Sequence, residues 1–374
     1  MDFELTEEQS LLRDTAREVL GRAYDVEKLR AVADTDRGWS EDVWSSLAEI
    51  GILGLPFTEE DGGAGAGFAE TAVVAGELGR SLAPEPYITG MATPGVAIAA
   101  VTDDTLRGEI VSAVSEGELV LAWAHDEPGD RWPASALATT AAAAGDGYTV
   151  TGTKSPVLAG DVAGKFVVTA TLDGAPALFL VDADASGVTR TALRTHDRRR
   201  AARITLDGAA ATALPVDDVA AVITKAEVVT QTLLCAEAVG AMEQALNQTT
   251  EYLKSRKQFG VPLKTFQALT HRASNMYVEL ELARSISTYA TMRLADDDVD
   301  PATASRAKLQ ICRSARLIGQ ETIQLHGGIG LTAEYPVGHV VSRLTAIAHT
   351  LGGADDHLRA LSESVADHDM LTLI

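Results

Sequence analysis

The chain has 374 residues, of which 53 are acidic and 31 basic, so it carries a formal charge of −22. That length predicts two or three domains, and the acidic charge argues against binding to nucleic acid or to an anionic membrane, which need a basic surface. Two cysteines without a CxxC pair argue against a disulfide framework and a thiolate zinc site. The acidic N-terminus is not a signal peptide, and no apolar run approaches the ~18 residues of a membrane span, so we expect a cytoplasmic protein.

The N-terminal third has the residue spacing of helices. Thr6 precedes Gln9 by three residues, which is a capping-box pattern ahead of a helical run. Ser40 begins a second run of apolar residues at helical spacing. An acidic, glycine-rich stretch over 58–67 is interpreted as a surface loop, and a helical pattern resumes over 69–82.

The central third differs in character. Between residues 119 and 217, short apolar or alternating runs are separated by Gly and Asp turns at regular spacing. This pattern predicts a small β-sandwich or β-barrel. Helical patterns of useful length are absent between these runs, which disfavours a parallel βαβ sheet.

The C-terminal third is helical again and predicts a four-helix bundle. Helical segments are expected over 226–255, 266–294, 301–325 and 340–351. The fold class is therefore α+β. The expected domains are an N-terminal helical domain over 1–117, a middle β-domain over 118–217 and a C-terminal bundle over 218–374.

Two motifs in the C-terminal third carry a resemblance to a known family. The first is YLKSRKQFG over 252–260, and the second is QLHGGIG over 324–330. Together with CAEAVG over 235–240, they resemble the C-terminal domain of the acyl-CoA dehydrogenase family, and the resemblance extends over essentially the whole chain. Within that family the chain is most similar to the small subunit of the pimeloyl-CoA type and to partner subunits of heteromeric steroid-side-chain dehydrogenases.

The resemblance implies α,β-desaturation of an acyl-CoA, with FAD as hydride acceptor and an electron-transfer flavoprotein as the next electron carrier. In the family one subunit supplies groups that hold a neighbour's flavin. Arg256 would pair with the pyrophosphate, since a guanidinium suits a bidentate phosphate contact. Gln267 and Gln324 would supply amide hydrogen bonds. The cofactor-binding motifs also contain Phe259, Leu325, His326, Gly327 and Gly328, of which the glycine pair lets backbone approach the dinucleotide closely.

The resemblance also exposes a missing base. The family removes the α-proton with a glutamate, and one common position for that residue falls here on Gly352. The other common position falls on Thr230, whose hydroxyl cannot serve as a general base near neutral pH. An arginine that often follows the second position is replaced by Gln231. The usual catalytic residue is therefore absent from both positions.

The residues that grip the flavin ring in the family are altered as well. The family's Thr-Glu-Pro and Ala-Gly-Ser-Asp stretch corresponds to HDEPGD over 125–130, and its aromatic-Ile-Thr triplet corresponds to PVL over 156–158. The ring half-site is thus eroded, whereas the half-site offered to a neighbour is intact. This asymmetry predicts the non-catalytic partner subunit of an α2β2 acyl-CoA dehydrogenase.

Two alternatives remain open at this stage. The first is a self-sufficient homotetramer with a relocated base, for which Glu237 is the leading candidate because its apolar sequence neighbours would raise its pKa. Further candidates for that base are Glu227, Asp355 and Asp356. The second is a structural or acyl-CoA-binding protein without flavin, against which the intact Arg256 argues. The acyl chain is not specified, although glycine at 352 suits a bulky substrate such as a steroid.

Other signals are weaker. Five arginines between residues 194 and 203 suggest either a contact for a CoA phosphate or an acidic partner, or a solvated turn. The eight histidines lack metal-ligand spacing, so no metal site is expected. Cys235 and Cys312 are expected to be buried and inert.

Overall fold

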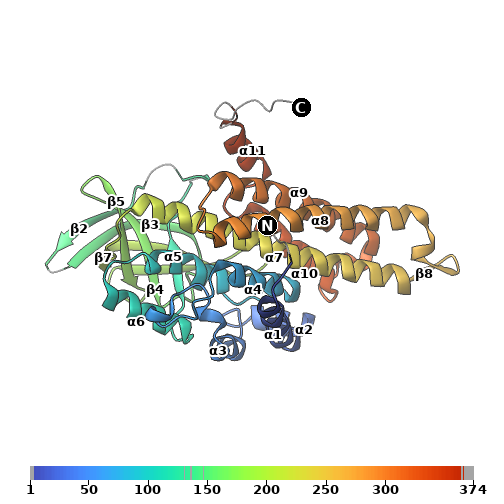
Figure 1. Cartoon of the computed structure of the whole chain (residues 1–374), viewed down its shortest axis with the longest axis horizontal. Coiled ribbons are helices and arrows are strands. Elements are labelled where there is room, and N and C mark those ends of the chain that lie inside the picture. The colour runs from blue at the N-terminus through green and yellow to red at the C-terminus, as the bar shows by residue number, and fades with distance from the viewer. Residues whose placement is uncertain (1–3, 130, 135–136, 146, 364, 366–374) are drawn as a thin grey trace.

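The computed structural model describes residues 4–129, 131–134, 137–145, 147–363 and 365. Figure 1 shows an elongated molecule with most of its strands gathered at one end. Long helices run from the strands to the opposite end, and the N-terminal helices cover one side.

The N-terminal helices begin where the sequence supplies caps. Thr6 and Gln9 form the expected reciprocal capping box, and the Ser40 side chain accepts a hydrogen bond from the Val43 N–H. These caps satisfy amide groups that a helix leaves without partners in its first turn. The helices of this region are α1 (Glu7–Ala23), α2 (Val26–Ala33), α3 (Glu41–Glu49), α4 (Phe68–Ser81), α5 (Thr93–Ala99) and α6 (Asp104–Ser115).

The central strands form a barrel, which resolves the two predicted alternatives. The strands are β1 (Leu121–Ala124), β2 (Thr140–Ala144), β3 (Gly147–Leu158), β4 (Lys165–Leu172), β5 (Ala175–Asp182), β6 (Val188–Arg194) and β7 (Arg200–Ala213). The sheet order runs β1-β4-β2-β3-β7-β5, and β5 also pairs with β4, which closes the ring. Apolar side chains from β3, β4, β5 and β7 fill its interior.

The C-terminal third is the predicted helical bundle. Its helices are α7 (Val219–Ser255), α8 (Gln267–Ala295), α9 (Pro301–His326), α10 (Pro336–His349) and the shorter α11 (Ala354–Glu363). The first helix starts seven residues before the expected position because the Asp218 side chain accepts a hydrogen bond from the Ala221 N–H and caps it. A two-stranded hairpin, β8 (Lys257–Gln258) and β9 (Val261–Pro262), joins α7 to α8.

Helix α7 is the central helix of the fold and packs against both the N-terminal helices and the bundle. It packs against α4 so closely that a Cβ atom on Gly79 would collide with the Glu237 carbonyl, and one on Gly240 with the Gly76 carbonyl. Its composition and length would allow it to span a membrane, contrary to the expectation from sequence, but more than half of its most apolar 18-residue window is buried. This burial explains the apolar composition as that of a core helix.

Candidate functional site

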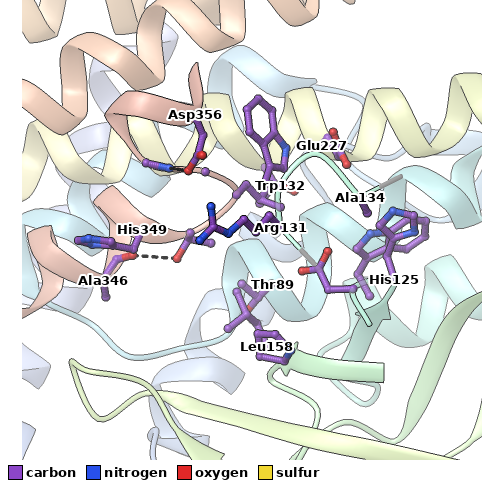
Figure 2. A pocket seen from close by; sticks show the side chains of 18 of the residues that line it. Thr89, His125, Arg131, Trp132, Ala134, Leu158, Glu227, Ala346, His349 and Asp356 are labelled. Carbon is purple, nitrogen blue, oxygen red and sulfur yellow. Dashed lines mark hydrogen bonds between the residues drawn. The ribbon is translucent and has the colours of Figure 1, made fainter. Parts of the chain in front are cut away.

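A cavity of about 810 Å³ lies between the barrel and the bundle. Its walls include the end of β1 and the loop after it (residues 123, 125–127, 131, 132 and 134), Ala226 and Thr230 of α7, and the end of α10 with the turn to Gly353. Figure 2 shows side chains from these elements around the cavity, together with Thr89 ahead of α5 and Leu158 at the end of β3. Both positions at which the family carries its glutamate therefore lie on this one cavity.

The loop after β1 is held by a buried ion pair. The Lys154 ammonium lies 2.8 Å from the Glu127 carboxylate and also donates to the His125 carbonyl, and the same carboxylate accepts from the Ala138 and Thr139 N–H groups. Burial alone would raise the pKa of Glu127, but these donors outweigh it and lower the pKa to about 2. The loop is thus fixed at its base, while Asp130 lies outside the described residues.

The barrel wall of the cavity contains an irregularity in the sheet. The register between β3 and β7 shifts between Lys154 and Val157, and Ser155 and Pro156 in that shift line the cavity. Proline lacks an N–H for the ladder and is found in such irregular positions. The Ser155 N–H donates instead to the Asp126 carbonyl at 2.8 Å, which ties this wall to the loop.

Gly352 is enclosed by aromatic groups. Its φ of +93° favours glycine, and a Cβ atom there would lie 2.5 Å from Trp132 Cε3 and 3.0 Å from His357 Nε2. The Trp132 and His357 rings lie 4.2 Å apart between their centroids. A glutamate at position 352 is therefore excluded twice, by its backbone conformation and by the Trp132 indole.

Thr230 is buried and fully engaged in hydrogen bonds. Its hydroxyl lies 2.7 Å from the Thr93 hydroxyl and donates to the Ala226 carbonyl at 2.6 Å. Both partners belong to the helical framework of the cavity. Thr230 therefore ties α5 to α7 at the second position where the family carries a base.

Glu227 is the carboxyl group that the structure brings to the cavity from α7. Burial, together with the nearby charge of Asp126, raises the pKa of Glu227 to about 7. The Trp132 indole N–H lies near this carboxyl and opposes the shift. Glu227, one of the further candidates for a relocated base, therefore has the raised pKa that the sequence analysis expected of Glu237.

Replacing Glu227 by Gln tests this environment. A carboxyl whose folded-state pKa is raised costs stability as pH rises from its unfolded value of 4.5 to about 7, because the folded state then holds the proton more tightly. The Tm of the variant, relative to wild type, should therefore rise between about pH 5 and about pH 8. Glu251→Gln, an exposed carboxyl on the same helix, is the control. A constant difference for both variants would contradict the assignment.

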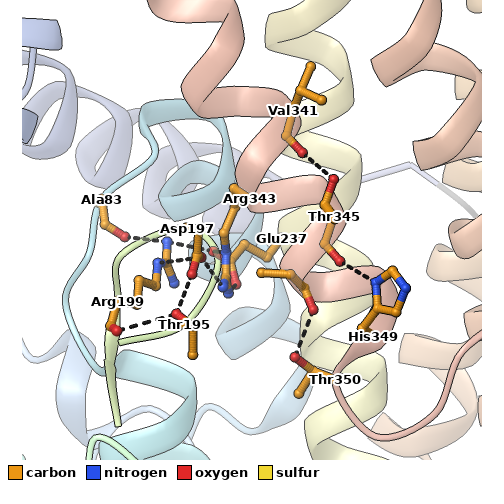
Figure 3. Close-up of polar contacts among 11 residues, drawn as sticks. Ala83, Thr195, Asp197, Arg199, Glu237, Val341, Arg343, Thr345, His349 and Thr350 are labelled. Carbon is orange, nitrogen blue, oxygen red and sulfur yellow. Dashed lines mark hydrogen bonds and ion pairs between the residues drawn. The ribbon is translucent and has the colours of Figure 1, made fainter. Parts of the chain in front are cut away.

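Glu237 was the leading candidate for a relocated base. The structure places it outside the residues that line the cavity, so that hypothesis is wrong. Its carboxylate, 1% exposed, binds Arg343 through two bonds of 2.8 and 2.6 Å and Arg199 at 2.8 Å, as Figure 3 shows. Asp197 completes the cluster at 2.8 Å from Arg343. Burial alone would raise the pKa of Glu237, but the two guanidinium groups lower it. It is an ionised structural group, the reverse of a poised base.

The remaining acidic candidates lie at the start of α11. Asp355 and Asp356 both line the cavity. Asp356 accepts a hydrogen bond from the Gly353 N–H at 3.0 Å and pairs with Arg359 at 3.2 Å. Its contacts are those of a helix-capping residue.

The residues expected to serve a neighbour's flavin lie at the far end of the bundle. Arg256 ends α7, Gln267 begins α8, and Gln324 lies in the last turn of α9; all three are exposed. Phe259, at the tip of the β8–β9 hairpin, is 92% exposed. Glu227 and Arg256 are 29 positions apart along α7, which at 1.5 Å per residue is about 40 Å. The two half-sites of one chain therefore cannot serve one ligand.

The glycine motif has an exposed part and a buried part. Gly327 and Gly328 are exposed, and a Cβ atom on either would find open space. Leu325 and His326 are buried, so their side chains pack in the bundle and do not face a ligand. The His326 ring stacks on Tyr252 at 4.5 Å, which fixes the end of α9 against α7.

Comparison with known proteins agrees with this geometry. The acyl-CoA dehydrogenase N-terminal domain matches residues 6–118, and the acyl-CoA dehydrogenase C-terminal domain matches residues 221–365. The chain belongs to the acyl-CoA dehydrogenase family. This family consists of FAD-binding oxidoreductases that act on the CH–CH group of acyl-CoAs.

Several relatives cover nearly the full length of this family member. Acyl-CoA dehydrogenase FadE27 of Mycobacterium tuberculosis is 30% identical, with 98% of this chain and 99% of the relative covered. The ChsE4–ChsE5 complex of Mycobacterium tuberculosis matches with a TM-score of 0.90 at 28% identity, covering 99% of this chain and 100% of that one. A Tcur3481–Tcur3483 steroid acyl-CoA dehydrogenase variant matches with a TM-score of 0.88 at 34% identity, covering 96% and 98%.

The arginine cluster is used within the chain. Arg198 pairs with Asp34, and Arg200 donates to the Thr35 carbonyl, so the turn between β6 and β7 is tied to the loop after α2. Arg199 joins the buried cluster around Glu237. These contacts favour an internal structural role over a CoA phosphate contact.

The cysteines behave as expected from their surroundings. Cys235 and Cys312 are both free and buried. Burial raises the pKa of the Cys235 thiol to about 12, which leaves it unreactive. The Cys312 thiol lies 3.3 Å from the Ala348 carbonyl at the end of α10.

Proposed function

We propose that this chain is the non-catalytic subunit of a heteromeric acyl-CoA dehydrogenase. It completes the flavin site of a partner subunit that carries the catalytic glutamate. The proposal rests chiefly on Gly352, whose position at the cavity admits no side chain. The cavity of this chain therefore lacks the base at the position from which the family reaches the substrate's α-carbon.

The half-site at the far end of the bundle supports the same proposal. Arg256 would bind the flavin pyrophosphate of the partner, with Gln267 and Gln324 donating amide hydrogen bonds beside it. Gly327 and Gly328 offer exposed backbone with open space around them. Bound in this way, FAD would supply the acceptor for the hydride that leaves the β-carbon. This chain's own part is to bind and orient the dinucleotide.

The relatives favour a heteromer and a bulky substrate. One similar structure is of the ChsE4–ChsE5 complex, and another is of a steroid acyl-CoA dehydrogenase. We infer a steroid-like acyl-CoA as the substrate class of the assembled enzyme. We further infer an α2β2 assembly in the cytoplasm and electron transfer to an electron-transfer flavoprotein.

The test is to express the chain alone and together with the acyl-CoA dehydrogenase paralogue encoded nearest to it. Native mass, flavin absorbance per chain and acyl-CoA turnover are measured for both preparations. We expect the chain alone to be colourless or low in flavin and inactive, and the co-expressed complex to carry flavin and turn over. A yellow, active homo-oligomer would overturn the proposal. A complex that never takes up flavin would support the flavin-free structural role instead.

Glu227 favours a second candidate function, a self-sufficient dehydrogenase with a relocated base. Its carboxyl lines the cavity one helical turn before Thr230, and its pKa of about 7 suits a general base. If the chain alone turns over acyl-CoA, Glu227→Gln should lower kcat by at least about a hundredfold. Glu237→Gln, in an active preparation that still folds, should leave kcat nearly unchanged. Equal turnover in wild type and Glu227→Gln would exclude this candidate.

A further inference from the structure

One wall of the cavity is formed by a large aromatic side chain that lies against Gly352. The indole of Trp132 projects from the loop after β1 and packs against Gly352 and the His357 ring, as Figure 2 shows for its approach to the α10–α11 turn. Its indole nitrogen is buried and has no hydrogen-bond partner among the residues that the structure describes. A large aromatic side chain therefore occupies the wall at which the family's catalytic carboxylate would lie.

Trp132 is held there by contacts from two directions. The loop that carries it is anchored by the Glu127–Lys154 ion pair, and the ring itself packs at a tilt of 41° against His357, with 4.2 Å between the ring centroids. The His357 ring is buried; its Nε2–H donates to the Leu351 carbonyl at 3.0 Å, and its Nδ1 lies 3.2 Å from the Ser305 hydroxyl. The indole thus rests on a rigid support, which suits a permanent occupant.

We propose that Trp132 is a built-in occupant of this chain's own reaction pocket and excludes a planar flavin ring from it. This inference deepens the proposed function, because it explains why the chain would serve a partner's flavin without holding one itself. An indole is flat and apolar over most of its surface, so it fills the kind of space that a planar aromatic ligand would fill. Gly352 and Trp132 then form a matched pair, since the indole can lie where it does only because position 352 has no side chain.

The occupancy can be tested with a ring that lacks the ribityl phosphate tail. Lumiflavin needs no contact from a neighbouring subunit, so its binding to the purified chain reports on the ring pocket alone. We expect wild type to bind lumiflavin weakly and Trp132→Ala to bind it at least about tenfold more tightly, because removing a half-buried aromatic group opens space to flat ligands. The readout is quenching of lumiflavin fluorescence in a titration.

The matched control is Trp123→Ala. Trp123 also lines the cavity, where it stacks on His125 at 5.8 Å, but it does not touch Gly352. We expect this variant to bind lumiflavin no better than wild type. Equal binding by wild type and Trp132→Ala, or equal gains in both alanine variants, would overturn the proposal. Absence of binding in every variant would also overturn it, because Trp132 would then not be what excludes the ring.

A second measurement does not depend on any ligand. Gly352→Ala is introduced into wild type and into Trp132→Ala, and the loss of Tm is compared between the two backgrounds. The strain of a positive φ is common to both, whereas the collision with Trp132 Cε3 is present only in the first. We therefore expect the loss to be larger in wild type. An equal loss in both backgrounds would contradict the matched pair.

These tests separate the inference from the proposed function. Lumiflavin binding and the Gly352 cycle use the single chain, and co-expression with the paralogue uses the assembly. If the chain alone proved active, the proposed function would fail irrespective of the lumiflavin result. If Trp132→Ala failed to bind lumiflavin while the complex carried flavin and turned over, the proposed function would stand. Exclusion of the flavin ring by Trp132 would then be refuted.

Discussion

Glu237→Gln is expected to destabilise the protein by about 3–5 kcal/mol, the usual cost of breaking a buried ion pair from one side. The substitution would leave Arg199 and Arg343 in a dry site with Asp197 as the remaining carboxylate of the cluster. Both guanidinium groups approach Glu237 within 2.8 Å and lie with it between the barrel, α7 and α10. An amide of the same shape keeps the packing but not the compensating charge.

Guanidinium unfolding of the purified protein measures this effect. The control is Arg284→Gln, which removes a half-exposed partner of Glu243 at 3.5 Å. That pair should contribute no more than about 1 kcal/mol, because solvent screens exposed ion pairs. The difference between the two variants distinguishes a buried charge cluster from a surface pair. A decrease of less than about 1 kcal/mol in the free energy of unfolding for Glu237→Gln would refute the structural role of Glu237.

Glu237 also shows which features the sequence could predict and which it could not. Helix starts depend on neighbours within a few residues, so the capping box of Thr6 and the start of α9 at Pro301 were predicted correctly. The charges that decide the pKa of Glu237 come from Arg343, 106 positions away in sequence. Its apolar sequence neighbours point to other faces of α7, so they gave the wrong sign for the shift.

In the candidate site, too, features within one continuous segment could be predicted, whereas contacts between distant segments could not. The family motifs indicated the residues at the far end of the bundle because each motif is a continuous segment at an exposed helix end. They did not indicate that Trp132 covers Gly352, since these residues are 220 positions apart and meet only when the loop after β1 packs on the α10–α11 turn. Likewise, the barrel closes where β4 pairs with β5. No local pattern specifies that β4 also pairs with β2 or that β5 also pairs with β7.

Arg256→Gln is expected to lower flavin retention in the co-expressed complex by about tenfold to a hundredfold. A hydrogen bond to a charged group is worth about 1.5–3 kcal/mol, and glutamine keeps much of the length of the side chain while removing its charge. Arg256 is exposed and ends α7 through its backbone bond to the Tyr252 carbonyl. The substitution should therefore leave the Tm of the chain alone unchanged.

Lys254→Gln supplies the matched control, because Lys254 is an exposed cation two residues earlier that pairs with Glu251 at 2.6 Å. Dialysis of both variant complexes followed by flavin absorbance per chain gives the comparison. Equal retention in the two variants would remove Arg256 from the flavin site. Selective loss in Arg256→Gln would come from a complex whose partner keeps its own glutamate and ring pocket. Since Arg256 is about 40 Å from this chain's own cavity along α7, such a loss would require that the flavin belong to another subunit.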